Sequence, residues 1–421
     1  MSAARTPAPS YSVLIAGAGI AGCAAAIALA RDGHHVRVVE KQREWRFLSS
    51  GIFVYSNGLE SLHDLGVLDA ILEAGFAIPG GRNAYFDHRG TPIINVTYPE
   101  GQTPGVPGIL GIKRAELHRV LATEMAALGV QVELGTTVEA IETGGHGADV
   151  RLSDGRRATF DLVIGADGIR SAMRPMIGIG VEPRHTGFGV WRAVHDRPPE
   201  LVEKIMLMGP GKRFGIMPIS DDKLYTFGTV AEPKDRRFDP AEWPQTMRAR
   251  FAEFDGPARP FLDDTGPHSE VFYTAVEEVA LPLPWHRGRV LLIGDAAHAS
   301  TPFMGQGGAM AMEDGVVLAR LLAVTDDIDA ALTRFGQLRA PVCTFVQDVS
   351  RAVGEAGARE DAAALAGRDA RMRREAQGAV DDFYARLRDF RHETDEAIRA
   401  FGETSARKRR ISVCETPGGV S

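Results

Sequence analysis

A glycine-rich turn between an apolar segment and an alanine-rich segment constrains the fold of this chain more than any other feature. Residues 12–16 (SVLIA) have the short, continuous apolar pattern of a buried parallel strand. Residues 21–32 have the spacing of a helix that stops at a glycine, and residues 36–40 (VRVVE) have a second strand pattern. The order predicts a strand–helix–strand unit of roughly 30 residues at the start of an α/β domain.

The glycines of this turn have separate roles in such a unit. Gly17 allows the tight turn, Gly19 lets the backbone approach a pyrophosphate, and Gly22 lets the helix pack on the strand. The helix N-terminus adds free N–H groups and a positive dipole end that suit a phosphate. Glu40 ends the second strand, close to the offset of about 20 residues expected for an acid that binds a ribose hydroxyl. We therefore predict dinucleotide binding rather than a purely structural turn. The candidate residues are Gly17, Gly19, Ile20, Ala21, Gly22, Glu40 and Lys41.

Two later segments narrow the choice of dinucleotide. Residues 161–171 (DLVIGADGIRS) and 288–302 (GRVLLIGDAAHASTP) each place an aspartate, Asp167 or Asp295, just past a predicted strand. Ligands of open α/β sheets bind at this edge, although such aspartates can also bond their own backbone in a turn. Residues 305–308 (GQGG) then open a predicted helix over 307–322, and its N–H groups can face a flat, electron-rich ring.

Together the three segments resemble the para-hydroxybenzoate-hydroxylase type of flavoprotein monooxygenase, group A, over about residues 12–322. Members that act on urate, salicylate or 6-hydroxynicotinate are the most similar. The resemblance implies that the first turn and Glu40 hold the ADP half of FAD, and that Asp167 helps to hold the pyrophosphate. It also implies that Asp295 bonds the ribityl chain and that residues 302–308 lie beside the isoalloxazine. The further residues implied in FAD binding are Arg114 (in IKRAEL), Asp167, Gly168, Gly294, Asp295, Pro302, Gly305, Gly307 and Gly308.

The same resemblance implies an enzyme with tightly bound FAD that uses NADH or NADPH and O2. Such an enzyme hydroxylates a small aromatic or N-heteroaromatic substrate through a flavin C4a-hydroperoxide. The sequence has no second strand–glycine–helix unit, so NADH or NADPH is expected as a transient co-substrate. The protein then supplies placement, a dry pocket and in some members a base that ionises the substrate.

The substrate pocket is expected beside residues 211–220 (GKRFGIMPIS) and 224–227 (LYTF). This stretch resembles the sheet of FAD-dependent urate hydroxylases, where an arginine and a tyrosine twelve positions apart face the substrate. Arg213 and Tyr225 match them and are the predicted catalytic residues, with Arg213 as a clamp for a carbonyl or carboxylate. A solvent-facing arginine and a packing tyrosine remain the alternative. The predicted pocket residues are Arg213, Met217, Tyr225, Phe227, Pro302, Phe303 and Met304.

The sequence pattern changes between about residues 186 and 274, where short β-rich segments alternate with turns. We expect an α/β fold with an inserted antiparallel sheet. The FAD-binding domain would comprise 1–75, 100–183 and 284–340, and the substrate-binding sheet 76–99 and 184–283. Residues 341–421 would form a helical region that caps the domains or makes a dimer contact, with a flexible tail from about residue 407.

Composition excludes several other classes. A net charge of −7 argues against a nucleic-acid partner, and no apolar run is long enough for a membrane span. Cys23, Cys343 and Cys414 are far apart, which argues against a disulfide scaffold and for the cytoplasm. No metal site is predicted, and the chain is expected as a monomer or homodimer.

Three other functions fit the fold less well. An oxidase, epoxidase or reductase of the same fold remains an open alternative. A flavin halogenase would carry a paired tryptophan motif, whereas Trp191 stands alone in its segment. A non-enzymatic protein like the Rab GDP-dissociation inhibitors would not need Asp167, Asp295 and residues 305–308.

Overall fold

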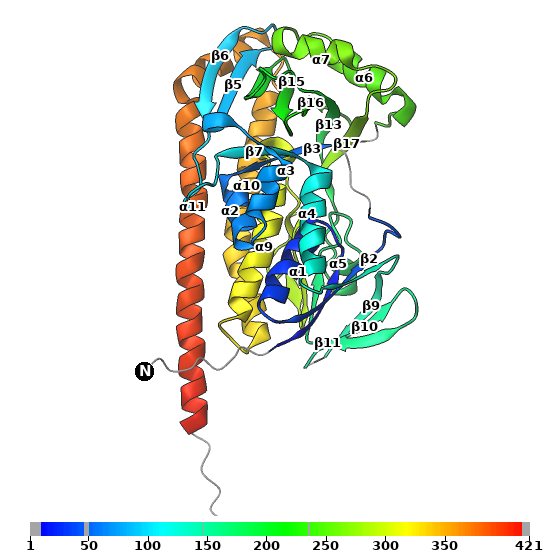
Figure 1. Cartoon of the computed structure of the whole chain (residues 1–421), viewed down its shortest axis with the longest axis vertical. Helices are drawn as coiled ribbons and strands as arrows, with labels where there is room; N and C mark the ends of the chain where they lie inside the picture. The colour runs from blue at the N-terminus through cyan, green and yellow to red at the C-terminus, as the bar shows by residue number, and fades with distance from the viewer. Residues whose placement is uncertain (1–9, 46–49, 145, 235, 415–421) are drawn as a thin grey trace, which may run out of the picture.

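The computed structural model describes residues 10–45, 50–144, 146–234 and 236–414. A six-stranded sheet forms one half of the molecule (Figure 1). All its neighbouring strands are parallel except at the β18 edge, and the central strand β1 is fully buried from Val13 to Ile15. The strands run in the order β18 (His286–Arg287), β19 (Val290–Leu292), β12 (Leu162–Gly165), β1 (Ser12–Ala16), β2 (His35–Glu40) and β8 (Gln131–Leu134).

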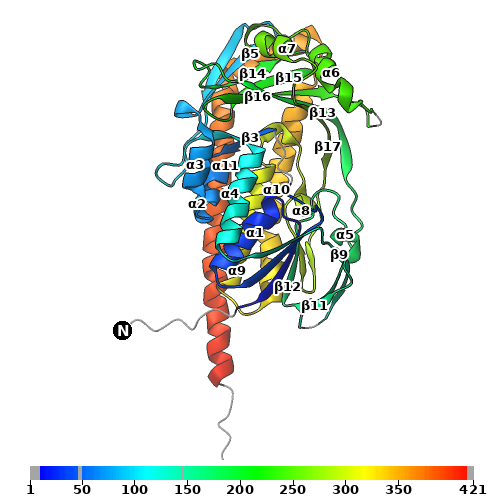
Figure 2. The same ribbon diagram turned by 45° about the vertical axis from the view of Figure 1, so that its right-hand side comes forward.

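Three helices pack beside this sheet (Figures 1 and 2): α1 (Ile20–Arg31), α4 (Arg114–Ala127) and α9 (Gly307–Leu322). Helix α1 begins just past the carboxyl end of β1, where the chain turns back to cover the apolar face, and α4 and α9 pack against α1. The small side chains of α1 let α9 approach it closely, and a Cβ at Gly315 would lie 2.6 Å from the backbone nitrogen of Ala25.

A seven-stranded sheet forms the other half. It is antiparallel apart from the β14–β5 pair, which is parallel. One face packs on α6 (Trp243–Arg250) and α7 (Arg259–Asp264), which Figure 2 shows at the top. A separate aromatic core lies between them. The order is β17 (Val271–Glu278), β13 (Arg184–Asp196), β16 (Lys223–Ala231), β15 (Lys212–Pro218), β14 (Lys204–Met208), β5 (Arg82–Asp87) and β6 (Pro92–Thr97). The predicted fold class is confirmed.

Two small sheets and several short helices complete the domains. One small sheet has the strand order β3 (Gly51–Tyr55), β7 (Ile109–Lys113) and β4 (Phe76–Ala77). The other is a meander of β9 (Val138–Thr143), β10 (Ala148–Leu152) and β11 (Arg157–Phe160). The short helices are α2 (Ser56–Asp64), α3 (Leu68–Ala74), α5 (Met173–Met176) and α8 (Asp295–His298). The 3-10 turns are η1 (Pro79–Gly81), η2 (Pro240–Glu242), η3 (Gly256–Ala258) and η4 (Pro302–Met304). Gly66 adopts a φ of +67° directly after α2, which separates α2 from α3.

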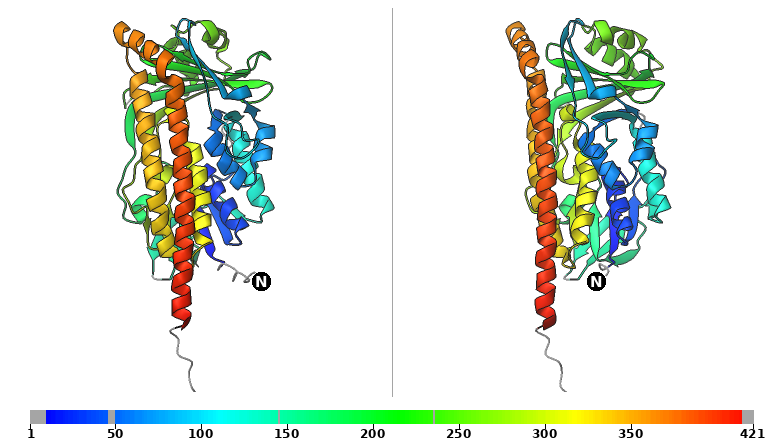
Figure 3. Two further views of the ribbon diagram at one scale, coloured as in Figure 1. Left: turned by 90° about the vertical axis from the view of Figure 1, so that its left-hand side faces the viewer. Right: turned by 60° about the vertical axis from the view of Figure 1, so that its left-hand side comes forward.

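Two long helices close the chain: α10 (Ile328–Gly357) and α11 (Ala362–Cys414). Figure 3 shows α11 running beside α10 along the whole molecule and past its end. The side chain of Gln377 bonds both backbone groups of Thr97 on the edge strand β6, and Arg391 pairs with Asp64 of α2. Helix α11 therefore caps both halves of its own chain.

Helix α11 continues to Cys414, so the tail expected from about residue 407 is helical up to that residue. The segment 407–414 (RKRRISVC) contains neither glycine nor proline, so nothing in it stops a helix. Residues 415–421 lie outside the described part of the chain. None of the helices formed by the described residues combines the length and apolarity that a membrane span requires.

Candidate active site

A cavity of about 700 Å³ lies between the two large sheets. Its lower end is formed by the β1–α1 turn, its middle by the loop before α9, and its upper end by β13 to β16. Helices α10 and α11 close one side. Ten predicted cofactor residues line it: Gly19, Ile20, Ala21, Arg114, Gly168, Asp295, Pro302, Gly305, Gly307 and Gly308.

The first glycine turn has the shape that a dinucleotide pyrophosphate requires. Gly17 has a φ of +104°, and a Cβ there would lie 2.4 Å from the carbonyl oxygen of Ala166. A Cβ at Gly22 would lie 1.9 Å from the carbonyl oxygen of Gly17, so helix and turn touch backbone to backbone. A Cβ at Gly19 would meet no atom within 4 Å. Two glycines thus pack the turn, while the third leaves open space at the start of α1, which fits FAD.

Glu40 and Lys41 do not line the cavity. The Glu40 carboxylate accepts hydrogen bonds from the backbone nitrogens of Ala18 and Gln42, each at 2.9 Å. Glu40 therefore fixes the glycine turn against the end of β2, a structural role that the sequence did not reveal. Lys41 is exposed.

The two aspartates differ in their surroundings. One Asp167 oxygen accepts hydrogen bonds from the backbone nitrogens of Ala172 (2.8 Å) and Met173 (3.1 Å) at the start of α5. The other Asp167 oxygen is buried and has no partner among the described residues, which leaves it free to accept from a bound hydroxyl or phosphate-linked group. Asp295 lines the cavity from the first turn of α8 and is exposed to it.

Gly305, Gly307 and Gly308, at the start of α9, present backbone rather than side chains to the cavity. Gly305 has a φ of +65°, and a Cβ there would overlap the ring of Phe53. At Gly307 and Gly308 an added Cβ would have only one neighbour within 4 Å each, at 3.6 Å and 3.5 Å. A flat ring can therefore approach the N-terminal N–H groups of α9, which again fits a flavin.

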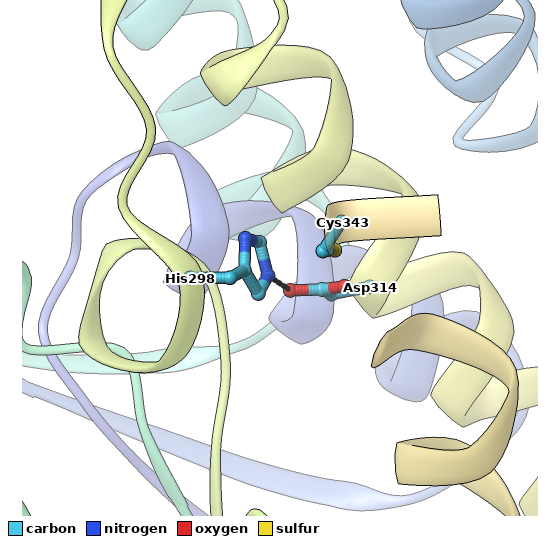
Figure 4. A group of neighbouring side chains, drawn as sticks. All are labelled: His298, Asp314 and Cys343. Carbon is cyan, nitrogen blue, oxygen red and sulfur yellow. Dashed lines mark hydrogen bonds and ion pairs between the residues drawn. The ribbon is translucent and has the colours of Figure 1, made fainter. Parts of the chain in front are cut away.

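A buried polar cluster holds this region in place (Figure 4). Asp314 accepts hydrogen bonds from the backbone nitrogen of Gly294 (2.8 Å), from Nε2 of His298 (2.7 Å) and from Nε of Arg339 (2.7 Å). Burial raises the pKa of Asp314, but His298 and Arg339 outweigh it and hold that pKa below its ordinary value. The atoms of His298, Asp314 and Cys343 that could bind a metal ion lie within 4.8 Å of one another. Because Arg339 already neutralises Asp314, we assign the cluster a structural role: it fixes Gly294 and hence Asp295.

The predicted substrate residues Arg213 and Tyr225 both line the upper part of the cavity. Across the β15–β16 ladder Arg213 lies opposite Thr229, and Met217 lies opposite Tyr225. Arg213 and Tyr225 therefore share one face of the sheet. The Arg213 guanidinium lies 4.6 Å from the ring centre of Phe303, and Tyr225 stacks on Phe227. Burial lowers the pKa of Arg213 to about 10, so the side chain stays charged at neutral pH.

Met217 does not line the cavity, although Phe227, Pro302, Phe303 and Met304 do. Met217 lies on the same face as Arg213 but at the far end of β15. There β7 covers it, and its side chain is fully buried opposite Gly111. The prediction of Met217 as a pocket residue is therefore wrong.

Sequence reasoning missed a second set of cavity residues. It comprises Tyr55, Tyr85, Tyr98, Arg192, Lys204, Arg368, Met372 and Tyr384, which come from five elements and one loop. One signal was present, because the strand Lys204–Met208 (KIMLM) places a lysine in an otherwise apolar run. The contribution of α11 had no signal, since its position depends on contacts such as that of Arg368 with the carbonyl oxygens of Met208 and Gly209.

Comparison with known proteins agrees with this site. The family model described as "FAD binding domain" matches residues 10–346. The aurachin C monooxygenase/isomerase of Stigmatella aurantiaca is 34% identical over 373 residues, which cover 88% of this chain and 96% of that protein. The 2-heptyl-3-hydroxy-4(1H)-quinolone synthase of Pseudomonas aeruginosa (strain UCBPP-PA14) is 35% identical over 355 residues, covering 82% and 89%. The solved structure of Klebsiella pneumoniae HpxO with FAD and uric acid has a TM-score of 0.78 and 28% identity, covering 88% and 95%.

The chain therefore belongs to the FAD-binding-domain family, within the group A flavin monooxygenases. It is an FAD-dependent monooxygenase that uses NAD(P)H and O2 to hydroxylate a small aromatic or heteroaromatic compound.

Proposed function

We propose that the substrate is an N-heteroaromatic ring with a carbonyl or ionisable oxygen and an apolar substituent, of the 2-alkyl-4-quinolone type. The wall that α10 and α11 build on the substrate half of the cavity carries this proposal. Its lining residues are mostly apolar: Val349, Val353, Ala356, Met372, Ala376, Ala379, Val380 and Phe383. Such a wall stabilises an alkyl chain by about 0.8 kcal/mol for each buried methylene group, a gain that a small polar purine lacks. The polar residues of the wall are Arg368, Arg371, Glu375 and Tyr384. The name of one relative, 2-heptyl-3-hydroxy-4(1H)-quinolone synthase, supports the same class.

The roles of the cofactor residues are part of the proposal. The Gly19 turn and the unpartnered oxygen of Asp167 would hold the FAD pyrophosphate region, and Asp295 the ribityl chain. The loop 302–308 would lie along the isoalloxazine, with Arg114 also beside the flavin. FAD supplies the oxygen-activating chemistry when bound, while these residues bind it, orient it and exclude water.

Arg213 and Tyr225 would position the substrate ring. The guanidinium offers a planar pair of donors to a carbonyl or an anionic oxygen, and its stacking on Phe303 fixes the direction of that pair. Tyr225, with Phe227 and Phe53, presents an aromatic surface on the same side of the cavity. Burial raises the pKa of Tyr225, so its hydroxyl stays protonated and can donate.

We further propose that residues 1–75, 100–183 and 284–340 form the FAD-binding domain and that 76–99 and 184–283 form the substrate domain. The protein would act in the cytoplasm as a monomer or homodimer. Light scattering on the FAD-loaded protein tests the oligomeric state.

A matched set of substrates tests the substrate class. We expect kcat/KM to be at least about tenfold higher for 2-heptyl-4(1H)-quinolone than for unsubstituted 4(1H)-quinolone or uric acid, because only the first compound uses the apolar wall. Ala376→Phe fills that wall and should remove the preference for the heptyl chain, whereas Ala400→Phe, on an exposed part of α11, should retain it. Faster turnover of uric acid than of either quinolone would overturn the proposal.

A further inference from the structure

Lys204 is a buried lysine that the fold directs into the cavity. It is the first residue of β14 and is only 4% exposed. Along this strand Lys204, Met206 and Met208 line the cavity, while Ile205 and Leu207 pack into the core beneath α6 and α7. The alternation of the strand therefore places the amine on the substrate side of the sheet.

The amine lies in an aromatic environment. Its Nζ lies 2.9 Å from the hydroxyl oxygen of Tyr55, and 4.6 Å and 5.2 Å from the ring centres of Phe53 and Tyr98. No carboxylate of the described residues pairs with it. The other titratable groups that line this cavity are the phenols Tyr55, Tyr85, Tyr98, Tyr225 and Tyr384, the guanidinium groups of Arg114, Arg192, Arg213, Arg368 and Arg371, and the carboxylates of Asp295 and Glu375. Of their charges, that of Arg213 acts on Lys204. An unpaired buried lysine is costly, and an apolar residue would be more stable at this position.

The position of the amine relative to the cofactor loop gives it a chemical use. Phe53 contacts both the cofactor loop and the lysine: its ring fills the space beside Gly305, and Nζ of Lys204 lies over the same ring. The amine is therefore one ring away from the loop that we propose lies along the flavin. A substrate ring held there by Arg213 would present its polar edge to this part of the cavity.

Burial, followed by the charge of Arg213, lowers the pKa of Lys204 to about 7. Near neutral pH a large fraction of the side chain is thus the free amine, which can accept a proton. The raised pKa of Tyr55 keeps that neighbour protonated, so Lys204 is the base of the pair.

We propose that Lys204 is a catalytic base, which takes the proton from an acidic ring hydroxyl or ring N–H of the substrate and holds the resulting anion together with Tyr55. This inference rests on the proposed function. The O–H or N–H bond of the substrate breaks, its electron pair stays on the ring, and a new N–H bond forms on Nζ. The proton returns to the product or to water after oxygen transfer. An anionic ring is richer in electrons and reacts faster with an electrophilic oxygen.

Binding of 4-nitrophenol to the oxidised, FAD-loaded protein tests this without turnover, because only the ionised probe absorbs strongly in the visible. We expect the bound probe to ionise about one pH unit or more below the free probe, since an adjacent ammonium favours the anion. Lys204→Met should abolish the shift and Lys204→Arg should retain it. Lys223→Met, a matched change at a largely solvent-facing ion pair with Asp196, should leave it intact. A probe that ionises at the same pH with and without the protein overturns the proposal, as does a shift that survives Lys204→Met.

Carbamylation by cyanate gives a second readout, because only a neutral amine reacts. Mass spectrometry should find Lys204 modified with a half-maximal rate near pH 7, with protection by 4-nitrophenol, while Lys223 reacts appreciably only at much higher pH. Equal pH profiles for the two lysines would contradict the assignment. Neither experiment uses NAD(P)H. Failure to hydroxylate any ring compound would therefore refute the proposed function alone, and a probe unaffected by Lys204 would refute this inference alone.

Discussion

Removal of the Arg339 guanidinium should destabilise the protein far more than removal of an exposed arginine. Arg339 is 1% exposed, and it contacts Asp314 and Glu313 at 2.7 Å and 2.6 Å and the carbonyl oxygen of Met310 at 3.1 Å. Arg339→Met keeps much of the apolar stem but leaves Asp314, which has no exposed surface, with His298 as its remaining charged partner.

The structure sets the size of the effect. Breaking a buried ion pair costs about 3–5 kcal/mol, out of a total stability of about 5–15 kcal/mol for a typical domain. With an unfolding entropy of about 2.1 cal/mol/K per residue, this corresponds to a Tm lower by roughly 3–6 °C for a chain of this length. The control Arg320→Met removes the Arg320–Asp395 pair, whose side chains are 40% and 33% exposed, and should cost about 0–1 kcal/mol.

Calorimetry of the FAD-loaded proteins measures the loss of stability, and flavin fluorescence after dilution measures FAD release. Asp314 also accepts the N–H of Gly294, so Arg339→Met should release FAD faster than Arg320→Met. Equal Tm values for the two variants would refute our reading of the buried cluster. A lower Tm with unchanged FAD release would refute only its link to the cofactor loop.

Three further predictions concern the cavity. Gly19→Ala should lower FAD affinity at least about tenfold with little loss of apoprotein stability, because the added Cβ enters open space where the pyrophosphate must approach. The control Gly367→Ala, where the added Cβ also enters open space but on α11, should leave FAD affinity unchanged. Arg213→Ala should raise the substrate KM by about tenfold or more and divert reducing equivalents to H2O2, whereas Lys212→Ala, on the opposite face of β15, should not; equal KM values would remove Arg213 from the site. Lys204→Met should raise Tm. In the folded protein the pKa of Lys204 is about 7, against an ordinary value of 10.5. The charged lysine therefore lowers the free energy of unfolding by its full amount below pH 7, and by nothing above pH 10.5. The gain in Tm should therefore be larger at pH 7 than at pH 10, and a gain independent of pH would contradict the assigned cause.

Elements with strong local signals were predicted closely. Strand Ser12–Ala16 and helix Gly307–Leu322 have the bounds that apolar periodicity and the flanking glycines indicated. Turn geometry at Gly17 and Gly22 also followed from residue type, since only glycine permits these backbone approaches.

Features that depend on distant parts of the chain were not predicted. Met217 has the right alternation for the pocket, but whether β7 covers it is decided by tertiary packing. Likewise, Lys204 becomes a cavity residue only because β14 pairs with β15 and its amine meets Phe53 and Tyr55 of β3. No local pattern in α11 revealed that it forms a wall of the cavity, because its place depends on Gln377 and similar contacts with the edge strand.

Oxygen labelling tests most directly that this chain is a monooxygenase. The FAD-loaded protein would be given NADH or NADPH, ¹⁸O2 and 2-heptyl-4(1H)-quinolone, and product, NAD(P)H consumption and H2O2 would be quantified together. The account predicts a hydroxylated product with one ¹⁸O atom per molecule, formed with one NAD(P)H per turnover. Consumption of NAD(P)H with all oxygen recovered as H2O2 across quinolones, pyridines, purines and benzoates would contradict it and identify an oxidase instead.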